Sequence, residues 1–281
     1  MFVKSLLDRI VDNALAEDLE GGDLTTEATV PPEARAVARA VARKDLVVCG
    51  ADVFARVFSR VDPGVRVERA LDEGADAKRG DVIWIAEGSA RSLLMAERTA
   101  LNFVQRMSGI ATLARSYVRA LPEGAKTRVT DTRKTTPGLR VLERYAVRVG
   151  GAHNHRDTLG SAVMIKDNHI QAAGGIALAV ERARARAPHT SKIEVEVASL
   201  AELDQALAAG ADIVMLDNFA PADVAVGVAK ARGKALVEVS GGITLERIAE
   251  LARAGVDVIS SGALTHSAPS ADIALDLERL G

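Results

Sequence analysis

The stretch that decides the fold is "KIEVEVASLAELDQALAAGADIVMLDN", residues 192–218. It opens with a short apolar run, continues with apolar residues at helical spacing, and ends in a second apolar run. Ser199 followed by Glu202 fits a capping box at the start of a helix, and Gly210 is a natural helix stop. The stretch therefore predicts a strand, a helix and a second strand.

The same pattern recurs after about residue 124, where six strands are predicted with helical patterns between them. The strands are TRVTDT (127–132), SAVMI (161–165), KIEVEV (192–197), ADIVML (211–216), KALVEV (234–239) and VDVIS (256–260). Apolar strands separated by helices indicate a parallel sheet covered on its faces. Six such units fit an incomplete α/β barrel, although an open doubly wound sheet has a similar signature.

The N-terminal part lacks this repeat. Residues 1–18 predict an amphipathic helix, and residues 34–90 predict short strands joined by glycine turns. Residues 91–120 predict one or two helices, with a break expected at Ser108-Gly109. The chain therefore contains two regions of different character.

Composition excludes several classes of protein. Lys and Arg number 36 against 38 Asp and Glu, which is not the basic excess of a general nucleic-acid binder. Aromatic residues, at 3%, are too few for a base-stacking surface. Cys49 is the only cysteine, which excludes an internal disulfide and fits a reducing cytoplasm. The N-terminus reads as neither a signal peptide nor a membrane span, so we expect a cytoplasmic protein that binds neither nucleic acid nor membrane.

Cations gather where the predicted strands end. In a barrel the carboxyl ends of all strands point to one mouth, where active sites lie. Five cations fall at or near that mouth: Arg133, Lys134, His155, Arg156 and Lys166. An arginine grips a carboxylate through two bonds, and a lysine acts as a compact charge. The cluster therefore indicates a ligand that carries both carboxylates and phosphates.

Two glycine-rich loops, in "EVSGGITLERI" (238–248) and "VISSGALTHS" (258–267), follow the last two strands. Glycine lets backbone N–H groups approach an anion, and the start of the next helix is partly positive. Phosphate sites of barrels often lie at this place. Each loop alone is more simply a turn, but as a pair they indicate phosphate binding.

Acidic residues end two neighbouring strands. Glu196 and Asp217 are expected close together, where they suit Mg²⁺ or sugar hydroxyls, or merely neutralise the cations. Glu194 is expected to face away from Glu196, and Lys166 is a candidate partner for one of the two. A Schiff base on Lys166 is permitted by the sequence, but the cations and glycine loops favour anion binding.

Three histidines lie near the mouth: His153, His155 and His169. They lack a compact two-histidine helix motif, which argues against a transition-metal site.

The motifs resemble those of the quinolinate phosphoribosyltransferase family, the decarboxylating nicotinate-nucleotide pyrophosphorylases of NAD biosynthesis. The matching stretches are "ERTALNFVQRMSGIAT", "DTRKTTPGLRVLERYAVRVGGAHNHR", "IKDNHI", "IEVEV", "IVMLDN", "EVSGGI" and "SGALTHS", in family order. The N-terminal "ALAEDLEGGDLTTEATVP" also looks like the family's opening, so the resemblance covers nearly the whole chain.

The resemblance implies the fold of type II phosphoribosyltransferases. An N-terminal α/β sandwich over residues 1–108, to which the tail 271–281 returns, precedes a six-stranded incomplete α/β barrel over 109–270. It also implies a homodimer in which Arg98 reaches the neighbouring subunit's site. The implied reaction transfers phosphoribose from 5-phosphoribosyl-1-pyrophosphate to quinolinate with loss of CO₂, with Mg²⁺ as cofactor.

The resemblance also implies roles for single residues. The residues implied to bind quinolinate are Arg98, Arg133, His155, Arg156 and Lys166. The residues implied to bind 5-phosphoribosyl-1-pyrophosphate are Lys134, Glu196, Asp217, Ser240, Gly241 and Gly262. The catalytic set is Lys134, Lys166, Glu196 and Asp217, with Mg²⁺ held by the last two. Asp167 and Asn168 are secondary contacts, and Thr135 and Thr136 are further candidates for phosphate.

The chain departs from the family pattern at four positions. Val149 and Ala152 stand where the family usually has Cys and Gly, and Thr158 and Ser161 where Gly and Asp are common. These residues flank the expected pocket and leave its cations in place. They bear on loop shape rather than on the class of reaction.

Three alternative functions are also compatible with these motifs. A molybdenum-associated paralogue shares the RKT-type motif but tends to lack the full NHR and KDNH signatures, which are present here. A phosphosugar aldolase or isomerase would use Lys166 as a Schiff base. A non-catalytic anion-binding protein would keep the pocket without turnover.

Overall fold

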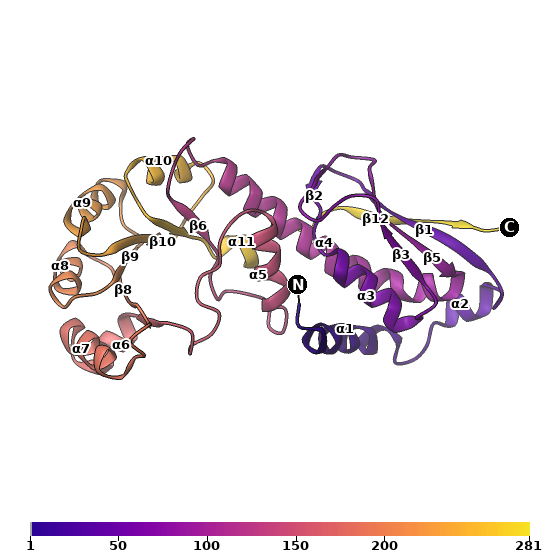
Figure 1. The fold of residues 1–281 in the computed structure, drawn as a ribbon, viewed down its shortest axis with the longest axis horizontal. Helices are drawn as coiled ribbons and strands as arrows, with labels where there is room; N and C mark the ends of the chain where they lie inside the picture. Colours follow the sequence, from indigo (N-terminus) through magenta and orange to yellow (C-terminus); the bar gives the residue numbers. More distant parts are fainter. Residues whose placement is uncertain (1) are drawn as a thin grey trace. The chain divides into compact units, whose positions relative to one another are not determined.

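The structure is a computed structural model that describes residues 2–281. It contains two compact units, each assembled from separate stretches of chain (Figure 1). Unit 1 holds the residues up to 115 together with 136–150 and 268–281, and unit 2 holds 116–135 and 151–267. Residues 136–150 lie within the range predicted for the barrel but cluster with unit 1.

Unit 1 contains a four-stranded antiparallel sheet in the order β12-β1-β5-β3. Its strands are β1 (Arg35–Ala42), β3 (Arg66–Arg69), β5 (Val82–Ser89) and β12 (Ile273–Arg279). Ala38 lies opposite Ala86 on one side and Leu277 on the other, so the C-terminal strand completes an edge of this sheet. A separate antiparallel pair is formed by β2 (Leu46–Val47) and β4 (Asp76–Ala77).

Helices join the sheet of unit 1 through aromatic packing and ion pairs. They are α1 (Lys4–Leu19), α2 (Leu24–Thr29), α3 (Ala51–Val61), α4 (Ala90–Arg119) and α5 (Arg140–Val149). On α3, Phe54 stacks on Trp84 of β5 with ring centroids 4.9 Å apart, and both side chains are fully buried. Arg56 of α3 pairs with Asp8 of α1. Helices packed on an antiparallel sheet make the α/β sandwich that the sequence motifs imply.

Helix α4 is continuous over 30 residues, so the break expected at Ser108-Gly109 is wrong. Gly109 has a different role. A Cβ atom at this position would lie 2.0 Å from the carbonyl oxygen of Pro269, on the segment that leads into β12. The glycine therefore permits a close backbone contact within unit 1 and does not end the helix.

Unit 2 contains six parallel strands in the order β6-β11-β10-β9-β8-β7. They are β6 (Arg128–Thr130), β7 (Val163–Ile165), β8 (Ile193–Val197), β9 (Ile213–Asp217), β10 (Leu236–Ser240) and β11 (Val258–Ser260). The helices are α6 (Asp167–Ala173), α7 (Ile176–Arg186), α8 (Leu200–Ala208), α9 (Pro221–Ala231), α10 (Arg247–Arg253) and α11 (Ala263–His266). Helices α7 to α10 follow the outside of the curved sheet (Figure 1).

The strand order distinguishes a barrel from a doubly wound sheet. From β7 to β11 each strand pairs with the next one in the chain, without the reversal that marks a doubly wound sheet. Strands β6 and β7 each have one paired neighbour and form the two edges. The sheet is therefore an incomplete six-stranded barrel.

Local signals in the opening stretch are confirmed. The Ser199 side chain accepts a hydrogen bond from the Glu202 N–H and caps α8, and Gly210 has a positive φ of 78°. Ile193, Val195 and Leu216 are fully buried. Within residues 2–281, no helix has both the length and the apolar character needed to cross a membrane.

The close contact at Gly109 gives a stability prediction. Gly109→Ala should lower the free energy of unfolding by about 1–3 kcal/mol, because the new methyl group must displace the Pro269 backbone. Helix propensity alone would favour alanine by about 1 kcal/mol, so the sign of the change tests the contact. Denaturant unfolding measures it. Gly21→Ala, at a site with no atom within 4 Å of the added carbon, is the control and should change stability little. Stabilisation by Gly109→Ala would contradict the contact.

Candidate active site

A cavity of about 400 Å³ opens at the carboxyl ends of the strands of unit 2. It contains most of the predicted site residues, although they come from distant parts of the sequence. The lining consists of Thr132, Arg133, Lys134, His155, Arg156, Met164, Lys166, Glu196, Met215, Asp217, Ser240 and Ser260. The structure therefore brings five cations and two acids to one mouth, as expected for parallel strands.

The loop after β6 carries Arg133 and Lys134. The Lys134 N–H donates to the Thr132 hydroxyl at 3.1 Å, and the buried Thr265 hydroxyl donates to the Lys134 carbonyl at 2.8 Å. A Cβ atom on Gly262 would lie 2.9 Å from the Lys134 side chain. Gly262 therefore does not line the cavity but leaves space for the lysine that does.

Lys166 lies directly after β7, and its ammonium group pairs with Glu196 at the end of β8. Asp217 ends β9, and its carboxylate accepts a hydrogen bond from the side chain of Asn218 at 2.9 Å. The partner expected for one of the two strand glutamates is therefore confirmed for Glu196. The two acids end adjacent strands and line the same cavity.

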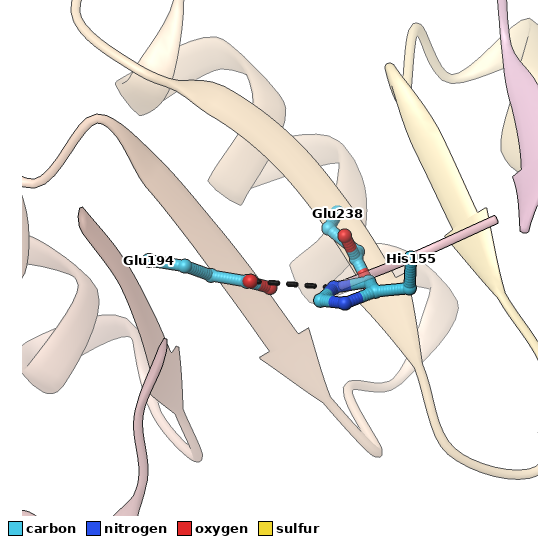
Figure 2. A group of neighbouring side chains, drawn as sticks. All are labelled: His155, Glu194 and Glu238. Carbon is cyan, nitrogen blue, oxygen red and sulfur yellow. Dashed lines mark ion pairs between the residues drawn. The ribbon is translucent and has the colours of Figure 1, made fainter. Parts of the chain in front are cut away.

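The expectation that Glu194 faces away from Glu196 is wrong. Side chains in a strand alternate with a period of two, so residues two positions apart share a face. Glu194 points toward the imidazole of His155, whose Nε2 lies 3.3 Å from the Glu194 carboxylate and 3.5 Å from that of Glu238 (Figure 2). Glu238 lies on β10 and was not singled out from the sequence, although an acid in an otherwise apolar strand was a usable signal.

The three side chains His155, Glu194 and Glu238 form a buried acid-histidine group, with 13%, 5% and 4% of their side chains exposed. Burial lowers the pKa of His155, but hydrogen bonds to the two carboxylates outweigh it and raise that pKa to about 10. The Arg156 N–H nevertheless donates to Nδ1 at 2.8 Å, and only a ring without a proton on Nδ1 can accept this hydrogen bond. The geometry is therefore that of the neutral ring, whose single proton lies on Nε2 and points at the carboxylates.

Arg156 and Arg133 are close enough to affect each other. Burial lowers the pKa of Arg156, the charge of Arg133 lowers it further, and Glu194 partly opposes this. One N–H of the Arg156 guanidinium donates to the Ala162 carbonyl at 3.1 Å. Two adjacent guanidinium groups repel each other, so an anion placed between them is favoured.

The glycine loop after β10 makes a tight turn. Gly241 and Gly242 have positive φ angles of 84° and 56°. A Cβ atom on Gly241 would lie 2.2 Å from the side-chain oxygen of Asn218, so only glycine fits there. Ser240 lines the cavity, whereas Gly241 is not among the lining residues.

Other predicted residues lie outside this cavity. Arg98 is on α4 in unit 1, where it lines a second cavity of about 470 Å³ that also involves α1 and α5. Asp167, Asn168 and His169 lie on the exposed helix α6. Thr136 belongs to unit 1, where its N–H and hydroxyl both donate to Glu143.

The three histidines considered as metal ligands do not come together within the described part of the chain. His155 instead groups with Glu194 and Glu238, whose nearest ligand atoms all lie within 4.8 Å of one another. Sequence reasoning also missed Asp131, which is fully buried directly after β6. Its carboxylate accepts from the His155 N–H at 2.8 Å and from the Asn154 side chain at 2.6 Å.

The four departures from the family pattern do not line the cavity of unit 2. Ala152 is buried, and Val149 ends α5 in unit 1. Thr158 and Ser161 close a short turn, in which the Ser161 hydroxyl donates to the Thr158 carbonyl at 3.0 Å. This turn lies between Arg156 and Ala162.

Comparison with known proteins agrees with these motifs. Residues 23–108 and 110–276 match the N-terminal and C-terminal domains of the family described as quinolinate phosphoribosyl transferase. A nicotinate-nucleotide pyrophosphorylase (carboxylating) of Mycobacterium leprae (strain TN) is 45% identical, with 95% of each chain covered. A probable enzyme of the same name from Bacillus subtilis (strain 168) is 42% identical, over 96% of this chain and 93% of its own.

Solved structures show the same likeness. The crystal structure of NadC from Streptococcus pyogenes is 41% identical and superposes with a TM-score of 0.94, over 100% of this chain and 99% of that one. The nicotinate-nucleotide pyrophosphorylase from Francisella tularensis is 39% identical with a TM-score of 0.92, over 99% and 98% of the two chains. Since both family domains match in order and full-length relatives exceed 40% identity, the chain belongs to the quinolinate phosphoribosyl transferase family.

Proposed function

We propose that this protein transfers the phosphoribosyl group of 5-phosphoribosyl-1-pyrophosphate to quinolinate, with release of pyrophosphate and CO₂ and formation of nicotinate mononucleotide. The observation that carries the proposal is the cavity of unit 2, where Arg133, Lys134, Arg156 and Lys166 lie with two strand-end acids. Both substrates are strongly anionic, and such a cavity would offset their mutual repulsion. The names of the full-length relatives support the same reaction.

The two substrates would use different parts of the cavity. The guanidinium groups of Arg133 and Arg156, with Lys166, suit the two carboxylates of quinolinate, because a guanidinium binds a carboxylate through paired hydrogen bonds. Lys134, Ser240, Glu196 and Asp217 suit the ribose and the pyrophosphate of the second substrate. Gly241 and Gly262 would act by leaving space for side chains, because an added Cβ would meet Asn218 at the first position and Lys134 at the second.

In the proposed reaction the C1–O bond to pyrophosphate breaks, and the quinolinate nitrogen forms a bond to C1 of the ribose. The charge that develops on the ribose is stabilised by the carboxylates of Glu196 and Asp217, and Lys134 stabilises the departing pyrophosphate. The bond between the ring C2 and its carboxylate then breaks, its electron pair stays on C2 beside the ring N⁺, and C2 takes a proton from water. Positioning and fixed charges suffice, without a covalent intermediate on the protein.

Mg²⁺ is the cofactor we propose. The carboxylate oxygens of Glu196 and Asp217 are the hard ligands that Mg²⁺ prefers, and both line the cavity. Because Lys166 already pairs with Glu196, Asp217 is the better placed of the two. When bound, Mg²⁺ would neutralise part of the charge of the pyrophosphate.

We also propose a homodimer with shared sites. Among the residues that the family resemblance assigns to quinolinate binding, Arg98 lies in unit 1, where it lines the second cavity. A second subunit would supply it to the cavity of unit 2. A cytoplasmic location remains a prediction, which the buried free thiol of Cys49 suits.

Removing one guanidinium should strongly lower quinolinate turnover in a protein that remains folded. Arg133→Ala and Arg156→Ala should each lower kcat/KM for quinolinate on the order of 10²–10³-fold, because a lost charge-assisted contact in such a site costs a few kcal/mol. CO₂ release from labelled quinolinate measures this. Arg186→Ala, on the exposed end of α7, is the matched control. Near-normal kinetics in both cavity variants would overturn the assignment, and absence of wild-type turnover would favour a non-catalytic binding protein.

Subunit mixing tests the shared site. Inactive Arg98→Ala and inactive Lys166→Ala proteins should regain up to about a quarter of wild-type activity after exchange, because one of the two sites in a mixed dimer is then intact. Subunit exchange is verified by native mass spectrometry with one partner isotopically labelled. If exchange occurs without recovery, Arg98 does not act on the partner's site.

The magnesium proposal predicts metal-dependent substrate binding. Chelation of Mg²⁺ should abolish turnover, and Asp217→Asn should raise the Mg²⁺ concentration needed for half-maximal binding of 5-phosphoribosyl-1-pyrophosphate by about tenfold, through loss of one charged ligand. Calorimetric titration at several Mg²⁺ concentrations provides this readout. The matched control is Asp223→Asn, on the exposed first turn of α9. Full activity in the absence of divalent metal would exclude this role.

A further inference from the structure

The buried acid-histidine group has a feature that the proposed reaction does not use. Glu194 and Glu238 approach the ring of His155 but are not among the residues that line the cavity, whereas His155 and Arg156 are. The Oε1 atom of Glu194 is buried without a hydrogen-bond partner, and the buried Oε1 atom of Glu238 faces the His155 Nε2 at 3.5 Å. Two buried carboxylates beside one imidazole cost desolvation energy, so their presence calls for a role other than stability.

Both ring nitrogens of His155 are directed at protein groups. Nε2 faces the two carboxylates (Figure 2). Nδ1 accepts the N–H of Arg156 at 2.8 Å. The backbone N–H of His155 is in turn held by Asp131 at 2.8 Å. The ring therefore connects β8 and β10 to the backbone of Arg156, and it offers no ring nitrogen to a ligand in this arrangement.

We propose that Glu194 and Glu238 are positioning residues that fix the ring of His155 and, through it, place Arg156 for a carboxylate of the substrate. This inference rests on the proposed function for the identity of that substrate. It gives His155, which lines the cavity, the further role of connecting the two acids to Arg156. Because Glu194 and Glu238 approach the same Nε2–H, either one keeps the ring oriented when the other is lost.

This redundancy sets the design of the test. The double variant Glu194→Gln/Glu238→Gln keeps an acceptor oxygen on both strands, and Glu194→Leu/Glu238→Leu removes both. The dissociation constant of quinolinate should rise on the order of 10- to 100-fold in the double Leu variant, which corresponds to the loss of one charged hydrogen-bond network. It should stay within about threefold of wild type in the double Gln variant and in each single Leu variant, since an acceptor remains.

Two further measurements and one control variant distinguish positioning from a general structural defect. Calorimetric binding of 5-phosphoribosyl-1-pyrophosphate with Mg²⁺ should be unchanged in both double variants. Thermal stability of the double Gln variant should be equal to or above that of wild type, since buried charges are removed. Glu181→Leu, on the exposed face of α7 in the same unit, is the control for loss of an acid.

Nitrogen NMR of the histidine ring tests the proposal in the unmodified protein, should the double Leu variant not fold. The Nε2 of His155 should be protonated and Nδ1 unprotonated, and neither ring nitrogen should change protonation when quinolinate is added. A quinolinate-induced change at either nitrogen, or normal quinolinate affinity in a folded double Leu variant, would overturn the proposal. If wild-type protein binds no quinolinate, the proposed function fails instead, whereas the ring signature still reports on the positioning.

Discussion

The site depends on holding like charges together. Arg133, Lys134, Arg156 and Lys166 share a cavity of about 400 Å³, and the neighbouring guanidinium of Arg133 already lowers the pKa of Arg156. Part of this repulsion is offset inside the protein, because Lys166 pairs with Glu196 and Glu194 lies close to Arg156. An anion is favoured in a cavity that holds like charges together, because it reduces the repulsion between them. A cavity of this kind is prepared for its ligand before binding.

The parallel sheet is what made the site predictable from sequence. Since all six strands run the same way, residues that follow each strand meet at one edge, and this rule predicts the shared position of Arg133, Lys134, Lys166, Glu196 and Asp217. Glu194 was assigned to the wrong face through a misapplied strand period, although the correct period of two predicts its shared face with Glu196. Glu238 was detectable in the same way, as an inward-facing acid among apolar neighbours.

Other features depend on contacts that no local pattern records. Ser108-Gly109 looked like a helix break because glycine is a poor helix former, yet the helix continues and the glycine accommodates the Pro269 backbone. Gly241 and Gly262 are predicted to bind phosphate, and the structure adds that a Cβ atom at these positions would meet the side chains of Asn218 and Lys134. In each case the residue type was noticed, and its neighbour came from a distant part of the chain.

His155 shows why a residue's role requires geometry as well as a motif match. The "NHR" motif places a histidine and an arginine next to each other at the mouth, and both line the cavity. The histidine's two nitrogens nevertheless face Glu194, Glu238 and the Arg156 backbone, so what the ring can offer to a ligand differs from what the arginine offers. Two buried acids on separate strands are a costly way to orient one ring. That cost is understandable if the position of the neighbouring guanidinium, rather than the stability of the barrel, is what the arrangement maintains.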